Sequence, residues 1–193
     1  MTNWWWVRHG PTHHAGLVGW SDIAADLSDS DAIARLDAHL PDDALVVSSD
    51  LIRCVATADR LSGTRERLPH TSDLRELHFG DWELKGFGEV AAQDPEISRA
   101  YWEDPGDIAP PNGESWNEAA ARIARAVARI TAAHQGRNIV AVAHFGAILT
   151  QIQRATNIPA KSALGFKIDN LSVTRLEHLG QDDWRVHGVN HVL

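Results

Sequence analysis

Short apolar runs alternate with longer amphipathic stretches in the first third of the chain. The first run, residues 3–7, ends abruptly at Arg8 and His9, which is typical of a strand buried on both faces and closed by a loop. Apolar residues then recur twice at helical spacing, in stretches closed by Pro41 and by Gly63. The predicted elements, in chain order, are a strand at 3–7, a helix at 31–40, a strand at 44–47 and a helix at 51–61.

The same alternation returns in the second half. A long amphipathic stretch begins at Trp116 and ends near Gly136, which we expect to be the helix C-cap. Residues 139–143 form the clearest apolar run in the sequence, and this run stops at His144. The elements expected after it are a helix at 146–156 and strand-like alternation from 166 to 176. Such alternation favours a three-layer α/β/α sandwich with a mostly parallel central sheet.

Residues 94–114 interrupt this pattern with several prolines and glycines among acidic and aromatic residues. Regular structure resumes on both sides, so the segment predicts an irregular excursion and not a linker between domains. We expect it to cover the functional site. The length and the absence of repeats predict one domain over residues 1–193.

The net charge of the chain limits the classes of ligand that it is expected to bind. The chain has 18 Lys and Arg against 26 Asp and Glu, a net charge of -8, which disfavours broad binding to nucleic acid or to an anionic membrane. An anionic ligand would need a local basic pocket. No apolar run approaches a membrane helix, no segment resembles a signal peptide, and the single cysteine, Cys54, fits a reducing compartment, so we expect a cytoplasmic protein. The sequence does not determine the oligomeric state.

Basic and imidazole side chains follow three of the predicted strands. Arg8 and His9 follow the first, Arg53 begins the helix after the second, and His144 ends the strand at 139–143. Ligands of open α/β sheets bind outside the carboxyl ends of parallel strands, so we expect these four residues to meet at one edge.

This set of residues suits a phosphate monoester, which carries about -1.5 to -2 charge at pH 7. Arg8 and Arg53 present planar forks that match phosphate oxygens, and the first turn of a helix adds free N–H groups near Arg53. A neutral imidazole is a competent nucleophile toward phosphorus, and His9 is the candidate. His144 would donate to an oxygen of the phosphoryl group in transfer.

A leaving alkoxide also needs a proton, and a carboxylic acid can supply it and later deprotonate water. Glu76 is a candidate on a loop after a short extended stretch. Spacing alone does not prefer Glu76 over Glu83 or Glu114.

Together these residues resemble the histidine phosphatase (phosphoglycerate mutase-like) superfamily, and most closely its α-ribazole phosphatase and bisphosphatase branch. The resemblance spans most of the chain. The matching segments, in order, are Arg8-His9-Gly10-Pro11-Thr12 for R-H-G-x-T, Gly19-Trp20-Ser21-Asp22 for G-W-x-D, residues 48–58 for S-S-x-L-x-R-x-x-x-T-A, residues 74–83 for L-x-E-x-x-F-G-x-W-E, Pro111-Asn112-Gly113-Glu114-Ser115 for P-x-G-E-S, and His144.

The resemblance implies a phosphoglycerate mutase-like fold and a metal-independent phosphatase that acts on a small phosphorylated metabolite. It makes His9 the phosphorylated nucleophile, Arg8, Arg53 and His144 the phosphate pocket, and Glu76 the proton donor. It implies no metal or organic cofactor, and none of the histidines has the spacing of a zinc signature.

Three positions depart from the family pattern. Ala15 replaces a common asparagine, Phe145 replaces the usual glycine after the second histidine, and Phe87 stands where mutase members carry a lysine. The last change favours hydrolysis over phosphoglycerate mutase chemistry. Mutase-type phosphotransfer and a non-catalytic phospholigand-binding module remain the alternatives.

A rival motif, Cys54 to Arg60, fits the C-x5-R pattern of cysteine-dependent phosphatases. That chemistry needs a glycine-bearing loop around a thiolate, whereas Cys54 lies on the apolar stripe of a predicted helix. Asp59 would also repel a phosphate. We therefore interpret the match as chance.

Overall fold

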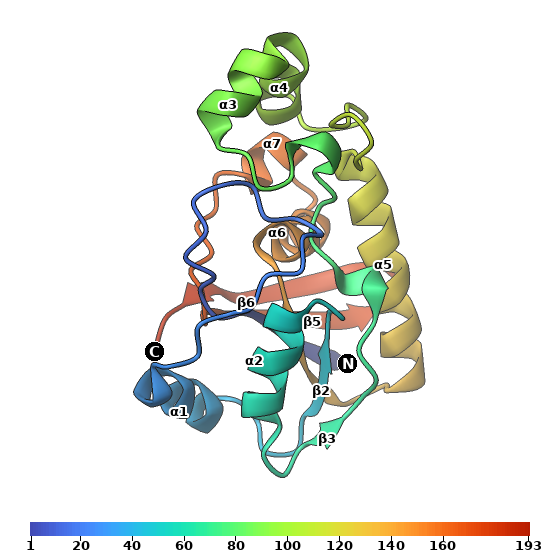
Figure 1. Ribbon diagram of the computed structural model, residues 1–193. Helices are drawn as coiled ribbons and strands as arrows, with labels where there is room; N and C mark the ends of the chain where they lie inside the picture. Colours follow the sequence, from blue (N-terminus) through green and yellow to red (C-terminus); the bar gives the residue numbers. More distant parts are fainter.

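The computed structural model describes all 193 residues and contains one six-stranded sheet flanked by helices (Figure 1). The strands are β1 (Thr2–Arg8), β2 (Leu45–Ser48), β3 (Glu66–Arg67), β4 (Asn138–Ala143), β5 (Val173–Gly180) and β6 (Asp183–His191). The helices are α1 (Ser30–His39), α2 (Ile52–Ser62), α3 (Phe87–Gln93), α4 (Pro95–Glu103), α5 (Trp116–Ala133), α6 (Phe145–Thr156) and α7 (Ala160–Ala163). Two short 3-10 turns are η1 (Ser72–Leu74) and η2 (Gly80–Trp82).

The strand order in the sheet is β3-β2-β4-β1-β5-β6. The first four strands run parallel, and β5 and β6 add an antiparallel edge. Strand β4 lies between β1 and β2, so the carboxyl ends of these three strands are neighbours. This order places the segments after Arg8, Ser48 and Ala143 at one edge of the sheet.

Alternate side chains of the central strands pack on opposite faces. Trp4 and Trp6 face the layer of α5 and α6, and their rings stack with centroids 5.2 Å apart. Val7 and Val142 face α1 and α2 on the other side. The predicted three-layer α/β/α sandwich with a mostly parallel sheet is confirmed, and Figure 1 shows α1 and α2 in front and α5 along one side.

The prediction of an irregular excursion over residues 94–114 is wrong in its first half, because Pro95–Glu103 form helix α4. Pro95 occupies the first helical turn, where a missing N–H removes no hydrogen bond, so the proline starts this helix. Helices α3 and α4 stand together beyond α6 and α7 at the top of Figure 1. Only the loop after Glu103 is irregular.

Two other expectations need correction. Helix α5 ends at Ala133 with His134 as its C-cap, and Gly136 uses its positive φ of 79° in the turn that leads to β4. The start of the helix is secured by a capping box between Ser115 and Glu118.

Strand β6 is not predicted by the sequence pattern, because its half-exposed residues show no apolar run. It forms by pairing with β5.

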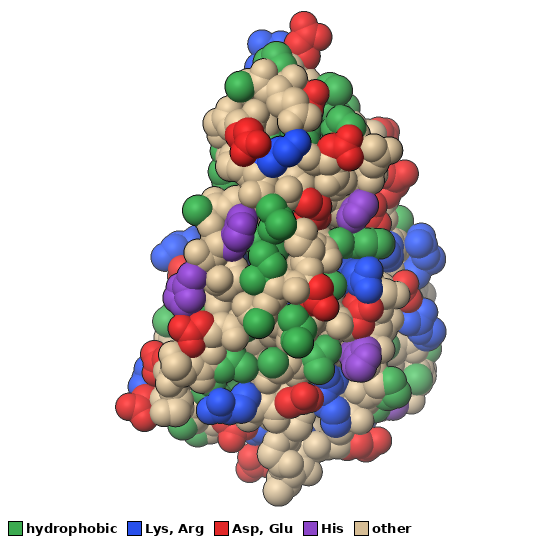
Figure 2. Space-filling model, in the orientation of Figure 1, with side chains coloured by type: hydrophobic (Ala, Val, Ile, Leu, Met, Phe, Trp, Pro, Cys, Tyr) green, Lys and Arg blue, Asp and Glu red, His purple; other side chains and the backbone are tan.

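The surface shows no concentration of one charge on the face drawn in Figure 2, where acidic and basic side chains are interspersed. None of the helices combines the length and the apolar character that a bilayer span requires.

Candidate active site

Three side chains from separate strand ends meet at the carboxyl edge of the sheet. The rings of His9 and His144 lie with centroids 5.2 Å apart at an angle of 63°. Arg53, in the first turn of α2, donates from Nε to Nδ1 of His144 over 3.2 Å. All three side chains are buried, with exposed fractions of 6% for His9 and 0% for the other two. The expected meeting of these residues is confirmed.

The ring of His9 is held in a defined tautomer. Its Nδ1 lies 2.7 Å from the carbonyl oxygen of Gly10. A carbonyl only accepts, so Nδ1 carries the proton and Nε2 keeps a free lone pair. Burial, together with the charge of Arg53, lowers the pKa of His9 to about 3. A neutral imidazole with an unprotonated Nε2 can act as a nucleophile.

Arg53 is fixed by backbone carbonyls as well as by His144. Its Nη1 donates to the carbonyl oxygen of Ser21 (2.8 Å) and its Nη2 to that of Gly19 (2.6 Å). Three of the five guanidinium N–H groups therefore have protein partners, and two have none. Residues 19–22, which match the G-W-x-D motif, thus orient Arg53.

Glu83 holds that segment in place. Its carboxylate accepts from the backbone N–H groups of Gly19, Trp20 and Ser21, from the hydroxyl of Ser21 and from the N–H of Phe79. A carboxylate with five donors around it has no spare lone pair directed at a ligand. Glu83 is therefore a structural acceptor, which removes it from the three glutamates that spacing left open.

Arg8 supplies the second cationic group. Its Nη1 donates to the carbonyl oxygen of Ile168 over 2.7 Å, and its guanidinium carbon lies 5.5 Å from the ring centroid of Phe145. Its Nε is buried and has no hydrogen-bond partner in the protein. Arg8 also lines the pocket described below, where its positive charge favours an anion.

Glu76 reaches the same place from the loop between η1 and η2. Its Oε2 accepts from the N–H of Gly146 (3.0 Å), and its Oε1 accepts from Leu77 (3.0 Å) and Ala147 (3.2 Å). The carboxyl thus sits against the first turn of α6. Burial raises the pKa of Glu76, while the hydrogen bonds from Gly146 and Leu77 and the charges of the two arginines oppose this shift. The upward shift favours the protonated acid relative to a glutamate in water.

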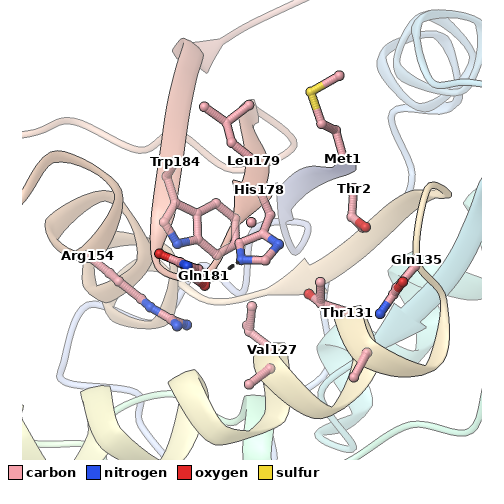
Figure 3. Close-up of a pocket in the computed structure, with 13 residues that line it drawn as sticks. Met1, Thr2, Val127, Thr131, Gln135, Arg154, His178, Leu179, Gln181 and Trp184 are labelled. Atoms are coloured by element: carbon pink, nitrogen blue, oxygen red, sulfur yellow. Dashed lines mark hydrogen bonds between the residues drawn. The ribbon is translucent and has the colours of Figure 1, made fainter.

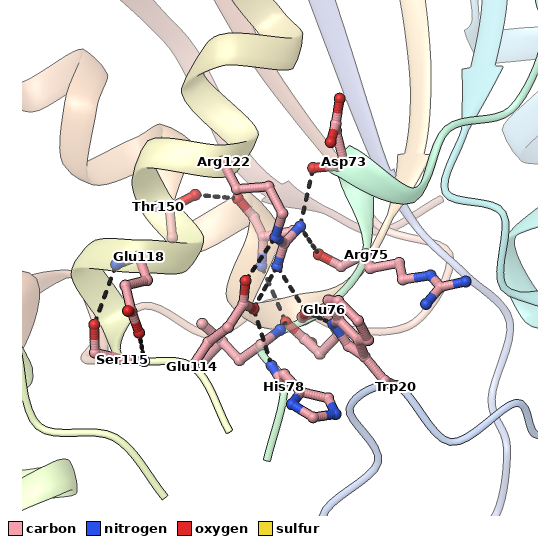
Figure 4. A network of polar contacts seen from close by, with 12 residues as sticks. Trp20, Asp73, Arg75, Glu76, His78, Glu114, Ser115, Glu118, Arg122 and Thr150 are labelled. Carbon is pink, nitrogen blue, oxygen red and sulfur yellow. Dashed lines mark hydrogen bonds and ion pairs between the residues drawn. The ribbon is translucent and has the colours of Figure 1, made fainter. Parts of the chain in front are cut away.

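A half-buried network of polar contacts holds the backbone of Glu76 (Figure 4). The carbonyl oxygen of Glu76 accepts from Trp20 Nε1 (2.8 Å) and from Arg122 Nη2 (3.0 Å). Arg122 also donates to both carboxylate oxygens of Glu114, at 2.8 and 2.7 Å. Glu114 is therefore committed to an ion pair. Among the three candidate glutamates, only Glu76 lines the pocket described next.

The pocket at this edge has a volume of about 220 Å³. Arg8, His9 and Glu76 form its polar end, and its remaining wall is mostly apolar and aromatic. His144 and Arg53 do not line it, because both are fully buried beside His9. The arrangement combines two guanidinium groups, a neutral imidazole and a buried carboxyl, which is a set of groups suited to phosphoryl transfer.

A second cavity, of about 390 Å³, lies where β1 begins, at the edge of the sheet opposite the strand carboxyl ends (Figure 3). It is enclosed by α5, α6 and the β5–β6 hairpin, with Thr131, Arg154 and Trp184 among its walls. It contains none of the predicted site residues. No group of three or more His, Cys, Asp or Glu side chains in the structure is placed to hold a metal ion.

Sequence reasoning missed three residues that build the site. Arg122 lies on a helix at an i, i+4 spacing from Glu118, which suggests only a surface ion pair. Trp20 and Thr57 belong to the quoted motifs, but nothing in the sequence shows that Trp20 binds the backbone of Glu76 or that Thr57 accepts from the N–H of Gly10.

Cys54, the centre of the rival motif, packs against the site without facing the pocket. Its sulfur lies 3.3 Å from Nε2 of His144, and its side chain is fully buried. Burial raises the pKa of the thiol well above its usual range. A buried protonated thiol on a helix does not provide the thiolate that cysteine-dependent phosphatases use.

Comparison with known proteins agrees with this geometry. A family model described as "Histidine phosphatase superfamily (branch 1)" matches residues 4–192. The adenosylcobalamin/alpha-ribazole phosphatase of Salmonella typhimurium is 28% identical over 172 residues, covering 86% of this chain and 85% of that protein. The glucosyl-3-phosphoglycerate phosphatase of Mycolicibacterium vanbaalenii is 34% identical over 192 residues, covering 92% of this chain and 80% of that protein.

Solved structures show the same fold. Bacillus stearothermophilus YhfR superposes with a TM-score of 0.90 at 26% identity, covering 100% of this chain and 98% of that chain. The mycobacterial glucosyl-3-phosphoglycerate phosphatase superposes with a TM-score of 0.85 at 27% identity, covering 99% of both chains. The expected phosphoglycerate mutase-like fold is confirmed by these neighbours.

Proposed function

Since the chain belongs to branch 1 of the histidine phosphatase superfamily, we propose that it hydrolyses a small phosphomonoester through a phosphohistidine at His9. Relatives named as phosphatases of alpha-ribazole and of glucosyl-3-phosphoglycerate support a small phosphorylated metabolite as substrate. The observation that carries the proposal is the neutral His9 ring, with Nε2 unprotonated, between two arginines and a buried glutamic acid.

In the first step, the lone pair of His9 Nε2 attacks phosphorus in line with the ester oxygen. An N–P bond forms and the P–O ester bond breaks. Protonated Glu76 gives its proton to the departing alkoxide, because a neutral alcohol is a far better leaving group than an alkoxide. Oε2 of Glu76 accepts only one backbone hydrogen bond, so one lone pair remains for this proton.

In the second step, Glu76 is a carboxylate and accepts a proton from water. The oxygen of that water attacks phosphorus and the N–P bond breaks, which releases inorganic phosphate and returns His9 to its neutral form. Glu76 is again an acid, so the cycle closes without any other proton donor. We propose no metal or organic cofactor for either step.

Arg8 and Arg53 neutralise the charge that spreads over the phosphoryl oxygens during both transfers. His144 accepts from Arg53 through Nδ1, so its proton is on Nε2 and faces the sulfur of Cys54. Sulfur is a weak hydrogen-bond acceptor, so this N–H would form a stronger hydrogen bond with a phosphoryl oxygen than with Cys54. His144 orients Arg53 without lining the pocket in the structure, and we propose that its Nε2–H donates to a phosphoryl oxygen once the group is bound beside His9.

Covalent labelling tests the proposal. Wild-type protein mixed with a radiolabelled phosphomonoester and quenched in alkali should retain label, because phosphohistidine survives base. His9→Ala should lose both label and turnover, and label that persists in His9→Ala would refute the assignment of the nucleophile.

Glu76→Gln tests the proton donor. We expect kcat for alkyl phosphates to fall about 10²-fold or more, the usual contribution of a general acid. Aryl phosphates, whose leaving groups need little protonation, should lose much less. An equal loss for both classes of ester would contradict the role of Glu76.

Mutase-type phosphotransfer is the alternative activity. Members that carry it place a lysine where this chain has Phe87, an exposed side chain on α3. Incubation with 3-phosphoglycerate distinguishes the two reactions, since hydrolysis releases phosphate and isomerisation does not. Stoichiometric phosphate binding without turnover would instead indicate a phospholigand-binding module. We place the protein in the cytoplasm, where the free buried thiol of Cys54 would persist.

A further inference from the structure

The pocket beyond its phosphate-binding end has an aromatic wall, which we define as Phe79, Phe87, Trp102 and Phe145. The ring centroid of Trp102 lies 5.6 Å from that of Phe87 and 6.2 Å from that of Phe79. These rings come from helices α3 and α4, from the loop before η2 and from the start of α6. Elements distant in the sequence thus place their rings on one side of a cavity of about 220 Å³.

The wall connects directly to the phosphate end through Phe145. This residue opens α6, and the guanidinium of Arg8 lies 5.5 Å from the centroid of its ring. In-line attack by His9 at the polar end of the pocket directs the ester oxygen away from His9, toward the remaining wall that these rings form. The leaving alcohol, and not the phosphoryl group, would contact these rings.

The wall is also exposed to solvent at its outer end. Phe87 is 60% exposed although phenylalanine is strongly apolar, and Trp102 beside it is only partly buried. Exposed aromatic groups that line a concave site are a usual mark of ligand contact. An apolar part of a ligand that covered them would remove this surface from water.

Cationic groups are absent from this part of the pocket. Arg8 is the only arginine or lysine among the residues that line it, and His14 at the exposed rim is the only other basic side chain besides His9. A second carboxylate or phosphate on the substrate would lie against aromatic rings without a partner. Desolvation of an unpaired charge is costly, so such substrates would bind poorly.

We propose that this site selects phosphomonoesters whose leaving alcohol carries an aromatic or bulky apolar group and no second anionic group. The proposal rests on the phosphatase activity proposed above. It distinguishes this chain from a phosphatase for phosphorylated sugar acids, whose substrates present a carboxylate beside the ester.

The test compares 2-phenylethyl phosphate, ethyl phosphate and 3-phosphoglycerate, whose leaving groups are all alcohols. We expect kcat/KM for 2-phenylethyl phosphate to exceed that for ethyl phosphate by about tenfold or more, the discrimination that one buried apolar group gives in an enzyme pocket. We expect 3-phosphoglycerate to be no better than ethyl phosphate. Equal kcat/KM values for the first two esters, or a preference for 3-phosphoglycerate, would overturn the proposal.

Variants locate the selectivity. Phe87→Ala should lower the ratio of kcat/KM for 2-phenylethyl phosphate to kcat/KM for ethyl phosphate about threefold or more. Phe145→Ala should lower this ratio as well. Ile97→Ala is the matched control, since Ile97 is an exposed apolar residue of α4 that does not line the pocket. A ratio that is unchanged in both phenylalanine variants, or that falls equally in Ile97→Ala, would refute the assignment to the wall.

Binding of the corresponding phosphonates separates this proposal from the catalytic one. Calorimetry should show tighter binding of 2-phenylethylphosphonate than of ethylphosphonate, with the difference reduced in Phe87→Ala. If no ester is hydrolysed but this preference appears, the proposed function fails and the selectivity stands. If esters are hydrolysed and neither rate constants nor binding differ, the selectivity fails and the function stands.

Discussion

The neutral state of the buried His9 ring should make folding stability depend on pH in a predictable way. Burial and the charge of Arg53 lower the pKa of His9 from its ordinary value of 6.5 to about 3 in the folded protein. Between these two values the unfolded chain binds a proton that the folded protein does not. The free energy of unfolding is therefore fully retained above pH 6.5 and falls as the pH drops from 6.5 toward 3.

The size of this loss follows from the shift. At pH 5 the imidazole of His9 is protonated in the unfolded chain and neutral in the folded protein. This pH lies about 1.5 units below the unfolded pKa, and each unit changes the free energy of unfolding by about 1.4 kcal/mol. His9 alone should thus lower the free energy of unfolding by about 2 kcal/mol between pH 8 and pH 5. This is a considerable fraction of the stability of a typical domain.

His9→Asn isolates this contribution, because the asparagine amide can still donate to the carbonyl oxygen of Gly10 but does not titrate. Urea unfolding of both proteins at pH 8 and pH 5 gives the double difference. We expect the loss on acidification to be about 2 kcal/mol smaller in His9→Asn, whatever its stability at pH 8. His144, whose pKa is also lowered by burial, is present in both proteins and cancels.

Parallel pH dependences in wild type and His9→Asn would refute the reasoning, because the ring would then bind its proton equally well in the folded and unfolded states. The neutral nucleophile on which the proposed mechanism depends would lose its support.

Three other substitutions test the construction of the site. In Gly146→Ala, the added Cβ would lie 2.5 Å from Oε1 of Glu76 and displace the carboxyl, so kcat for alkyl phosphates should fall about 10²-fold while phosphate binding measured by calorimetry persists. Unchanged kcat would contradict the placement of Glu76. Cys54→Ser should keep turnover within about tenfold in steady-state assays, whereas abolished turnover would support cysteine chemistry. Glu83→Gln should lower the free energy of unfolding by about 2 kcal/mol in urea titrations, because it weakens charge-assisted hydrogen bonds; an unchanged midpoint would show that the carboxylate charge is dispensable.

Local patterns in the sequence were sufficient for the layered architecture and for much of the site. Strand β4 is a continuous apolar run because both of its faces are buried. Strand β1 carries a similar run, although Asn3 and Trp5 on one of its faces are half-buried, and both runs are visible without any tertiary information. Polar residues that end such runs must lie at the carboxyl edge of a parallel sheet. The meeting of His9, Arg53 and His144 therefore followed from periodicity together with one topological rule.

Other features depended on contacts between segments distant in the chain. Glu76, Glu83 and Glu114 are equivalent in the sequence, and they differ only because each meets different partners: the first turn of α6, the backbone of residues 19–21, and Arg122. Strand β6 forms because an edge is available on β5, not because its own residues are apolar. The aromatic wall likewise joins rings whose sequence positions share no period.

The difference between what the sequence predicts and what only the fold decides has a physical cause. Burial of whole elements is set by the alternation of apolar and polar residues, which is local and can be read along the chain. The protonation state of His9, the role of each glutamate and the shape of the pocket depend on desolvation and on contacts between distant residues. Glu76 and Gly146 are 70 positions apart, and His9 and His144 are 135 positions apart. Those interactions exist only once the chain has folded, so only the tertiary structure decides them.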